Sequence, residues 1–185
     1  MKRKIASNYK MKYIYLGNWL QEKKLLSLSF FTKLAVIDNE SLTKRFTRKK
    51  NNNFRVIVKE QRLTFLESVS GYISRIPISG IGIYRSVRLE ANGFQNVYAK
   101  TFFPVKSLKG KERFIRILGS RSLGLYFLNT KRFKKIHVSY CVESDLVHRF
   151  ITYKNKSGTI YVDEIFPIDF RNEDINLFQA RRKRR

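Results

Sequence analysis

Two pairs of segments with the pattern of β-hairpins place the strongest constraint on the fold of this 185-residue chain. In each pair, two runs of strand composition flank a short turn that contains glycine. The pairs are 83–90 with 97–103, around the turn at 91–93, and 148–154 with 159–166, around the turn at 155–158. A chain with two such hairpins is predicted to form a sheet that is mainly antiparallel.

The other segments add two strands, several helices and a loop. We expect strands over 54–59 and 134–141, and helices over 25–37, 42–46, 107–118 and 122–128. Residues 68–82 carry several glycines and a proline, which is typical of a mobile loop. Because helices and strands follow no regular alternation, the sequence predicts an α+β fold, a single domain with a mostly antiparallel sheet of about six strands.

The chain is expected to form one domain, 25–170, between a basic arm at 1–24 and a basic tail at 171–185. Apolar residues make up 43% of the sequence, which excludes wholesale disorder. The single cysteine, Cys141, excludes an internal disulfide, and no secretory leader is expected. No apolar run reaches the roughly 18 residues that a membrane span needs.

The charge is strongly positive, with 39 Lys and Arg against 14 Asp and Glu, or +25 in total. Such a charge favours nucleic acid, an anionic membrane or an acidic small molecule as partner. The sequence is also rich in residues with AT-rich codons, so drift in a low-GC genome is an alternative source of the basicity. The charge alone therefore selects no function.

Two charged residues lie on strand faces that are otherwise apolar. Because side chains alternate across a strand, Arg85 shares a face with Ile83, Val87 and Leu89. By the same rule, Glu164 shares a face with Ile160, Val162 and Phe166.

Two interpretations of these charges stay open. Arg85 and Glu164 form a structural ion pair or reach an edge of the sheet, since a buried charge is costly unless it is paired. Alternatively, they line a ligand pocket in which Arg85 holds a carboxylate in a bidentate contact and Glu164 faces a hydroxyl or ether oxygen. Such a ligand would be small, planar and acidic.

Other binding motifs are weak. His137, Cys141 and His148 do not have the spacing of a zinc site, so we expect no metal. The chain has neither GxGxxG nor a Walker motif, which leaves nucleotide binding by those routes unsupported.

A set of short stretches, in a fixed order, resembles the chorismate pyruvate-lyase family, and in particular relatives encoded in red algal plastid genomes. The resemblance runs from about residue 26 to 168. The stretches are SLTKRF at 41–46, YRSV at 84–87, FPV at 103–105 with Ser107, Leu108 and Gly110, then Leu118-Gly119, Leu123-Gly124 with Tyr126, and DEIFP at 163–167. No single stretch is specific, but the set is.

The resemblance implies a chorismate lyase-like fold, with helices packed on one side of the sheet. It also implies an enzyme that removes pyruvate from chorismate and leaves 4-hydroxybenzoate, without metal or organic cofactor. Arg85 matches the arginine that grips the ring carboxylate, and Leu123 matches the position whose backbone N–H reaches the same group. Glu164 matches the glutamate at the hydroxyl end. Lys100 is our candidate for the second carboxylate, at a place where bacterial relatives tend to have arginine.

The resemblance further implies that the product feeds a prenylated quinone such as plastoquinone, in the plastid stroma or otherwise in the cytoplasm. We expect a monomer without a membrane span. Two alternatives are a non-catalytic sensor of the same fold, which would bind hydroxybenzoates without turnover, and a basic nucleic-acid-binding protein. The last predicts salt-sensitive binding that weakens when residues 181–185 are deleted.

Overall fold

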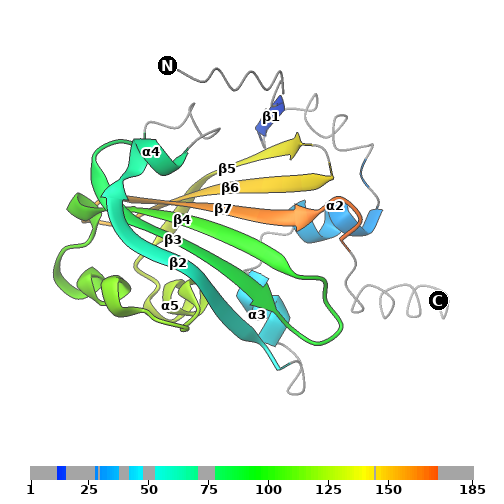
Figure 1. Ribbon diagram of the computed structural model, residues 1–185, viewed down its shortest axis with the longest axis horizontal. Coiled ribbons are helices and arrows are strands. Elements are labelled where there is room, and N and C mark those ends of the chain that lie inside the picture. Colours follow the sequence, from blue (N-terminus) through cyan, green and yellow to red (C-terminus); the bar gives the residue numbers. More distant parts are fainter. Residues whose placement is uncertain are drawn as a thin grey trace, which may run out of the picture.

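A seven-stranded antiparallel sheet forms the body of the protein in the computed structural model (Figure 1). The structure describes residues 12–15, 28, 30–37, 42–47, 53–70, 78–143 and 145–170. The strands, in sheet order, are β1 (Lys12–Tyr15), β5 (Lys134–Glu143), β6 (Leu146–Lys154), β7 (Thr159–Pro167), β4 (Val97–Pro104), β3 (Ile81–Glu90) and β2 (Arg55–Phe65).

Both predicted hairpins are present, as β3 with β4 and β6 with β7. The second turn is fixed by Asn155, whose side-chain oxygen accepts hydrogen bonds from the backbone N–H groups of Ser157 and Gly158, each at 2.9 Å. An asparagine that bonds to the backbone two and three residues ahead stabilises such a turn. The α+β fold with an antiparallel sheet of about six strands is therefore confirmed, with the four-residue β1 as an addition at one edge.

Several elements differ from the predicted boundaries. β2 continues to Phe65 and is followed by α4 (Leu66–Ser70), which takes the first residues of the predicted loop, and 71–77 lie outside the described residues. The predicted helix over 107–118 consists of two 3-10 helices, η3 (Val105–Ser107) and η4 (Gly110–Ile117). Gly110 has a φ of 57°, which an α-helix does not allow, so the two segments cannot join into one helix.

The helices are divided between the two faces of the sheet. α2 (Phe30–Ile37) and α3 (Leu42–Thr47) share one core cluster with the sheet, and α5 (Leu123–Thr130) shares a second with η4 and the same face. α4 packs instead against Tyr84 and Phe102 on the opposite face. The prediction of helices on one side thus holds for α2, α3 and α5, while the short α4 lies on the other.

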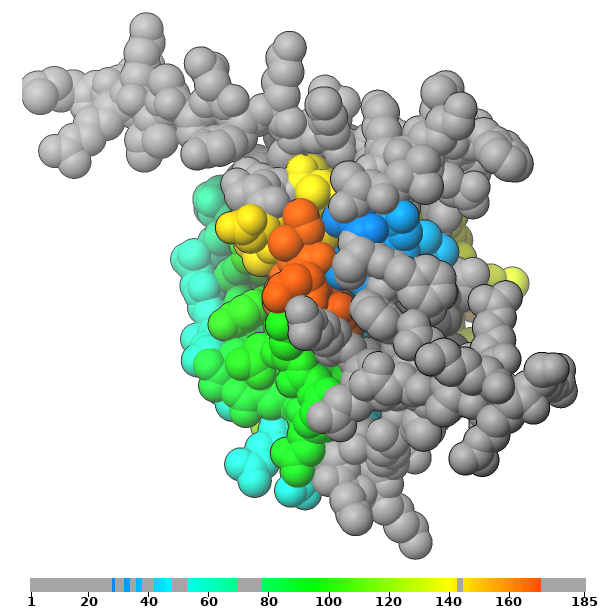
Figure 2. All heavy atoms as spheres, turned by 90° about the vertical axis from the view of Figure 1, so that its right-hand side faces the viewer, coloured from blue at the N-terminus to red at the C-terminus, as the bar shows by residue number. Residues whose placement is uncertain are grey.

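The end of β7 is tied to α2. The Thr32 hydroxyl donates a hydrogen bond to the backbone oxygen of Ile168 at 2.7 Å. Figure 2 shows this side of the molecule, with α2 in blue against the end of β7 in orange. The contact fixes α2 over the half of the sheet that carries Glu164.

Candidate functional site

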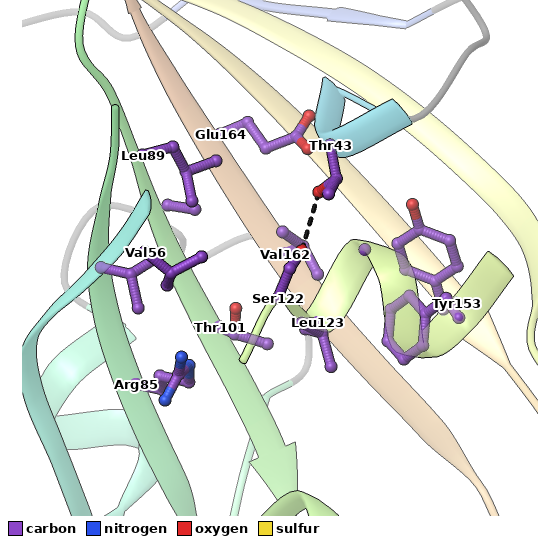
Figure 3. A pocket seen from close by; sticks show the side chains of 14 residues that line it. Thr43, Val56, Arg85, Leu89, Thr101, Ser122, Leu123, Tyr153, Val162 and Glu164 are labelled. Atoms are coloured by element: carbon purple, nitrogen blue, oxygen red, sulfur yellow. Dashed lines mark hydrogen bonds between the residues drawn. The ribbon is translucent and has the colours of Figure 1, made fainter. Parts of the chain in front are cut away.

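A cavity lies between the sheet and the helices α3 and α5 (Figure 3). Its walls are mostly apolar, and Arg85 and Glu164 are the charged residues among those that line it. The lining residues are Thr43, Val56, Arg85, Val87, Leu89, Ala99, Thr101, Ser122, Leu123, Gly124, Phe127, Tyr153, Val162 and Glu164. An apolar slot with a few converging polar groups is typical of a small-molecule site.

Arg85 lies on β3 and is 2% exposed. Its Nη1 donates to the side-chain oxygen of Gln61 at 2.6 Å, and its Nη2 donates to the backbone oxygen of Arg121 at 3.3 Å. Both acceptors are neutral, and among the described residues no carboxylate forms an ion pair with Arg85. Burial lowers the pKa of the guanidinium. A buried cation without an anion is costly, so this end of the cavity favours an anionic ligand.

Glu164 lies on β7, with β4 between it and the strand of Arg85. Its Oε2 accepts from Arg149 on β6, at 2.6 Å from Nε and 2.5 Å from Nη2. Arg149 is 2% exposed, donates from Nη1 to the backbone oxygen of Val36 at 3.0 Å, and stacks over Phe166 at 5.3 Å. The structure thus pairs Glu164 with Arg149, not with Arg85.

Arg149 is a residue that sequence reasoning missed. It alternates with Val147 and Ile151 along β6, so it is a third lone charge on an apolar strand face, of the same kind as Arg85 and Glu164. The same alternation rule would have found it.

Leu123 lies at the start of α5 and on the cavity wall. Ser122 caps this helix, since its hydroxyl accepts from the N–H of Leu125 at 3.3 Å and bonds to the hydroxyl of Thr43 at 2.9 Å. The N–H groups of a first helical turn have no partner inside the helix, so those of Leu123 and Gly124 are available beside the cavity, while that of Leu125 is bonded to Ser122. The Thr43–Ser122 bond also holds α3 against α5 (Figure 3).

The structure does not bring Lys100 to the cavity, which corrects its predicted place. Lys100 is opposite Ser86 and Asp163 in the sheet, and its neighbours Ala99 and Thr101 line the cavity instead. Because side chains alternate along β4, Lys100 points to the other face. There burial raises the pKa of Asp163, while the hydrogen bond with His148 and, to a smaller extent, the charge of Lys100 lower it.

No group of three or more metal-binding side chains occurs within the described ranges. His148, one of the residues considered for a metal, lies 3.1 Å from both carboxylate oxygens of Asp163 and is buried with it. Among the described helices, none is long and apolar enough to cross a membrane.

Tyr153 is a second cavity residue that the sequence did not single out. Its ring packs on Phe127, with the centroids 4.6 Å apart. Burial and the charge of Glu164 raise the pKa of its hydroxyl, while Arg149 lowers it. The hydroxyl therefore keeps its proton at neutral pH.

Comparison with known proteins agrees with the resemblance. No curated protein matches the chain. The family model for chorismate lyase matches residues 16–166, which is most of the sequence and includes the cavity and both of its charged residues. The chain therefore belongs to the chorismate lyase family.

Proposed function

We propose that the protein removes pyruvate from chorismate and releases 4-hydroxybenzoate, without a cofactor. The observation that carries the proposal is Arg85, a buried cation that faces an apolar cavity and has only neutral partners among the described residues. A ring carboxylate supplies the missing anion in the forked geometry that a guanidinium prefers. Membership of the chorismate lyase family supports the choice of ligand.

The cavity orients the ligand between two ends. With the ring carboxylate on Arg85 and the N–H groups at the start of α5, the ring lies along Val87 and Val162 and its hydroxyl faces Glu164. Arg149 holds the side chain of Glu164 in place, and Glu164 accepts a hydrogen bond from that hydroxyl.

The chemistry needs little more than this orientation. The ring loses the proton at C4 and the C3–O bond breaks, which forms the C3–C4 double bond and makes the ring aromatic. The leaving enolpyruvate takes up a proton and becomes pyruvate. Fixing the reactant in one geometry lowers the entropic part of the barrier, and the carboxylate of Glu164 is placed to assist the proton transfer.

We further propose that the product supplies a prenylated quinone such as plastoquinone, in the plastid stroma. The support is the resemblance of the quoted stretches to relatives from plastid genomes. Fractionation of organelles and immunodetection of the protein would test the compartment. Detection outside plastids would contradict it.

The test of activity is an assay of purified protein with chorismate that follows 4-hydroxybenzoate and pyruvate together. We expect equal amounts of both products, and loss of both in Arg85→Ala and Glu164→Gln. Arg88→Ala is the matched control, because Arg88 lies on the same strand but pairs with Glu90 and does not line the cavity. Binding of 4-hydroxybenzoate without turnover would contradict the lyase and indicate a sensor.

A further inference from the structure

Chorismate carries a second carboxylate, on its enolpyruvyl ether, for which the cavity has no obvious cation. Arg85 is the basic residue among the lining residues, and the ring carboxylate occupies it in the proposed orientation. Lys100 lies on the other face of the sheet. A neutral donor is therefore needed at the end of the cavity where Glu164 lies.

Tyr153 approaches that end from β6. It lines the cavity, and Figure 3 shows its side chain extending from the strand toward the level of Thr43 and Glu164. The ring packs on Phe127 at an interplanar angle of 49°, which limits the positions of the hydroxyl. Because β6 lies on the side of β7 away from Arg85, Tyr153 enters the cavity from the side opposite to the ring carboxylate. Along the strands it lies opposite Ile160, four residues from Glu164 on β7, and its side chain extends from there toward Glu164.

The Tyr153 hydroxyl makes no hydrogen bond with the residues that the structure describes, although its ring packs on Phe127. By contrast, the hydroxyls of Thr43 and Ser122 bond to each other, and that of Ser122 also accepts from Leu125. Polar groups in such partly buried places normally have a partner. Thr101 is the other lining residue whose hydroxyl makes no hydrogen bond with the described residues, but it lies opposite Arg85 in the sheet. Tyr153 is thus the hydroxyl on the Glu164 side of the cavity that is placed to bond a ligand.

We propose that Tyr153 is a substrate-binding residue whose hydroxyl donates a hydrogen bond to the enolpyruvyl carboxylate of chorismate. The inference rests on the proposed function, because it takes chorismate as the substrate. In chorismate, C3 carries the enolpyruvyl ether and is next to C4, whose hydroxyl faces Glu164. The enolpyruvyl group therefore lies at the Glu164 end of the cavity. The product 4-hydroxybenzoate lacks this group, and Tyr153 therefore distinguishes substrate from product.

The test compares Tyr153→Phe with the wild type, since this change removes one oxygen and keeps the packing on Phe127. We expect kcat/KM for chorismate to fall about 10- to 100-fold, the range for a hydrogen bond to a charged group. The dissociation constant for 4-hydroxybenzoate should stay within about twofold, because no lost contact involves the product. Tyr161→Phe on β7, whose side chain packs on the opposite face, should change neither value.

A pair of ligands gives a readout that does not depend on turnover. 3-(Carboxymethoxy)-4-hydroxybenzoate carries a second carboxylate beside the ring hydroxyl, and 3-ethoxy-4-hydroxybenzoate has a similar side chain without the charge. The wild type should prefer the first compound, and Tyr153→Phe should lose that preference. Equal affinities in the wild type would overturn the inference even if the variant failed to fold.

The outcomes separate the two proposals. Turnover by the wild type together with an unchanged kcat/KM in Tyr153→Phe overturns the role of Tyr153 and leaves the lyase standing. A parallel loss of affinity for both ligands and for 4-hydroxybenzoate also overturns it, because it indicates packing rather than a specific bond. Absence of turnover in the wild type overturns the proposed function, and the inference with it.

Discussion

Arg85 and Arg149 lie on the same face of the same sheet and are equally buried, yet their surroundings differ in one respect. Arg149 has the carboxylate of Glu164, the backbone oxygen of Val36 and the ring of Phe166. Arg85 has two neutral oxygens, from Gln61 and the backbone of Arg121, and a cavity. One arginine has an anionic partner within the fold, and the other has none among the described residues.

The partners of the two arginines determine how much each one costs the stability of the free protein. A buried ion pair is neutral overall and costs stability mainly when one partner is removed. A buried cation with neutral partners costs stability in the free protein, and an anionic ligand recovers that cost on binding. Functional sites commonly reduce stability in this way. The pair at Arg149 therefore stabilises the fold around the cavity, while Arg85 is the residue that we propose to bind an anionic ligand.

The largest effect is expected from Arg85→Met. Loss of a forked contact to a carboxylate should raise the dissociation constant for 4-hydroxybenzoate by about 100-fold or more, while the melting temperature stays equal or rises. Titration calorimetry and thermal unfolding measure the two quantities. Arg88→Met is the control on the opposite face of the same strand. A large fall in melting temperature for Arg85→Met alone would mean that Arg85 is a structural residue.

Arg149→Met should mainly lower the stability of the fold, whereas Arg85→Met should mainly lower the affinity for the ligand. Removing Arg149 leaves the partly buried Glu164 without its cation, which is expected to cost up to about 3 kcal/mol of stability. Adding Glu164→Gln should recover part of that loss, because the unpaired charge is then gone. Urea unfolding of the two single variants and the double variant gives the coupling energy. Additive effects would contradict the ion pair as the source of the cost.

The two arginines also show what the sequence could and could not reveal. Alternation along a strand was enough to place Arg85 and Glu164 on apolar faces, because the period of two is a local property. Alternation alone does not show which faces of two neighbouring strands lie on the same side of the sheet, since that depends on their register. Lys100 was misplaced for this reason. The pairing of Glu164 with Arg149 was within reach of the sequence, because a turn at 155–158 sets Lys154 opposite Thr159 and thereby Arg149 opposite Glu164.

The fold was predictable where local chemistry decides it. The hairpin turns contain residues that favour tight turns, so both hairpins could be predicted. The segment over 107–118 has the amphipathic pattern of a helix, yet Gly110 and the sheet beneath impose 3-10 geometry instead. The extension of β2 to Phe65 follows from pairing with β3 and is not visible in β2 itself.

Gln61→Glu should give Arg85 a carboxylate partner, as Glu164 is for Arg149. The new carboxylate lies where the Gln61 oxygen accepts from Arg85, at 2.6 Å, and so competes with a ligand. We expect about tenfold weaker binding of 4-hydroxybenzoate and a rise in stability of about 1 kcal/mol, reduced by the lost bond to the backbone oxygen of Arg116. Gln61→Leu, which removes the oxygen without adding charge, is the matched control. Equal effects of both variants would contradict competition for Arg85.

The smallest effect is expected from salt. Buried charges are screened much less than exposed ones, so the contact between Arg85 and a ligand should change little with ionic strength. The net charge of +25 adds a long-range attraction that salt weakens. We therefore expect affinity for 4-hydroxybenzoate to fall less than about fivefold between about 0.05 M and 0.5 M NaCl. A fall of about a thousandfold is typical of proteins that bind nucleic acid through many phosphate contacts, and a single carboxylate held by a buried arginine releases too few counterions to produce it. A steep dependence for 4-hydroxybenzoate would mean that exposed basic residues, and not Arg85, hold the ligand.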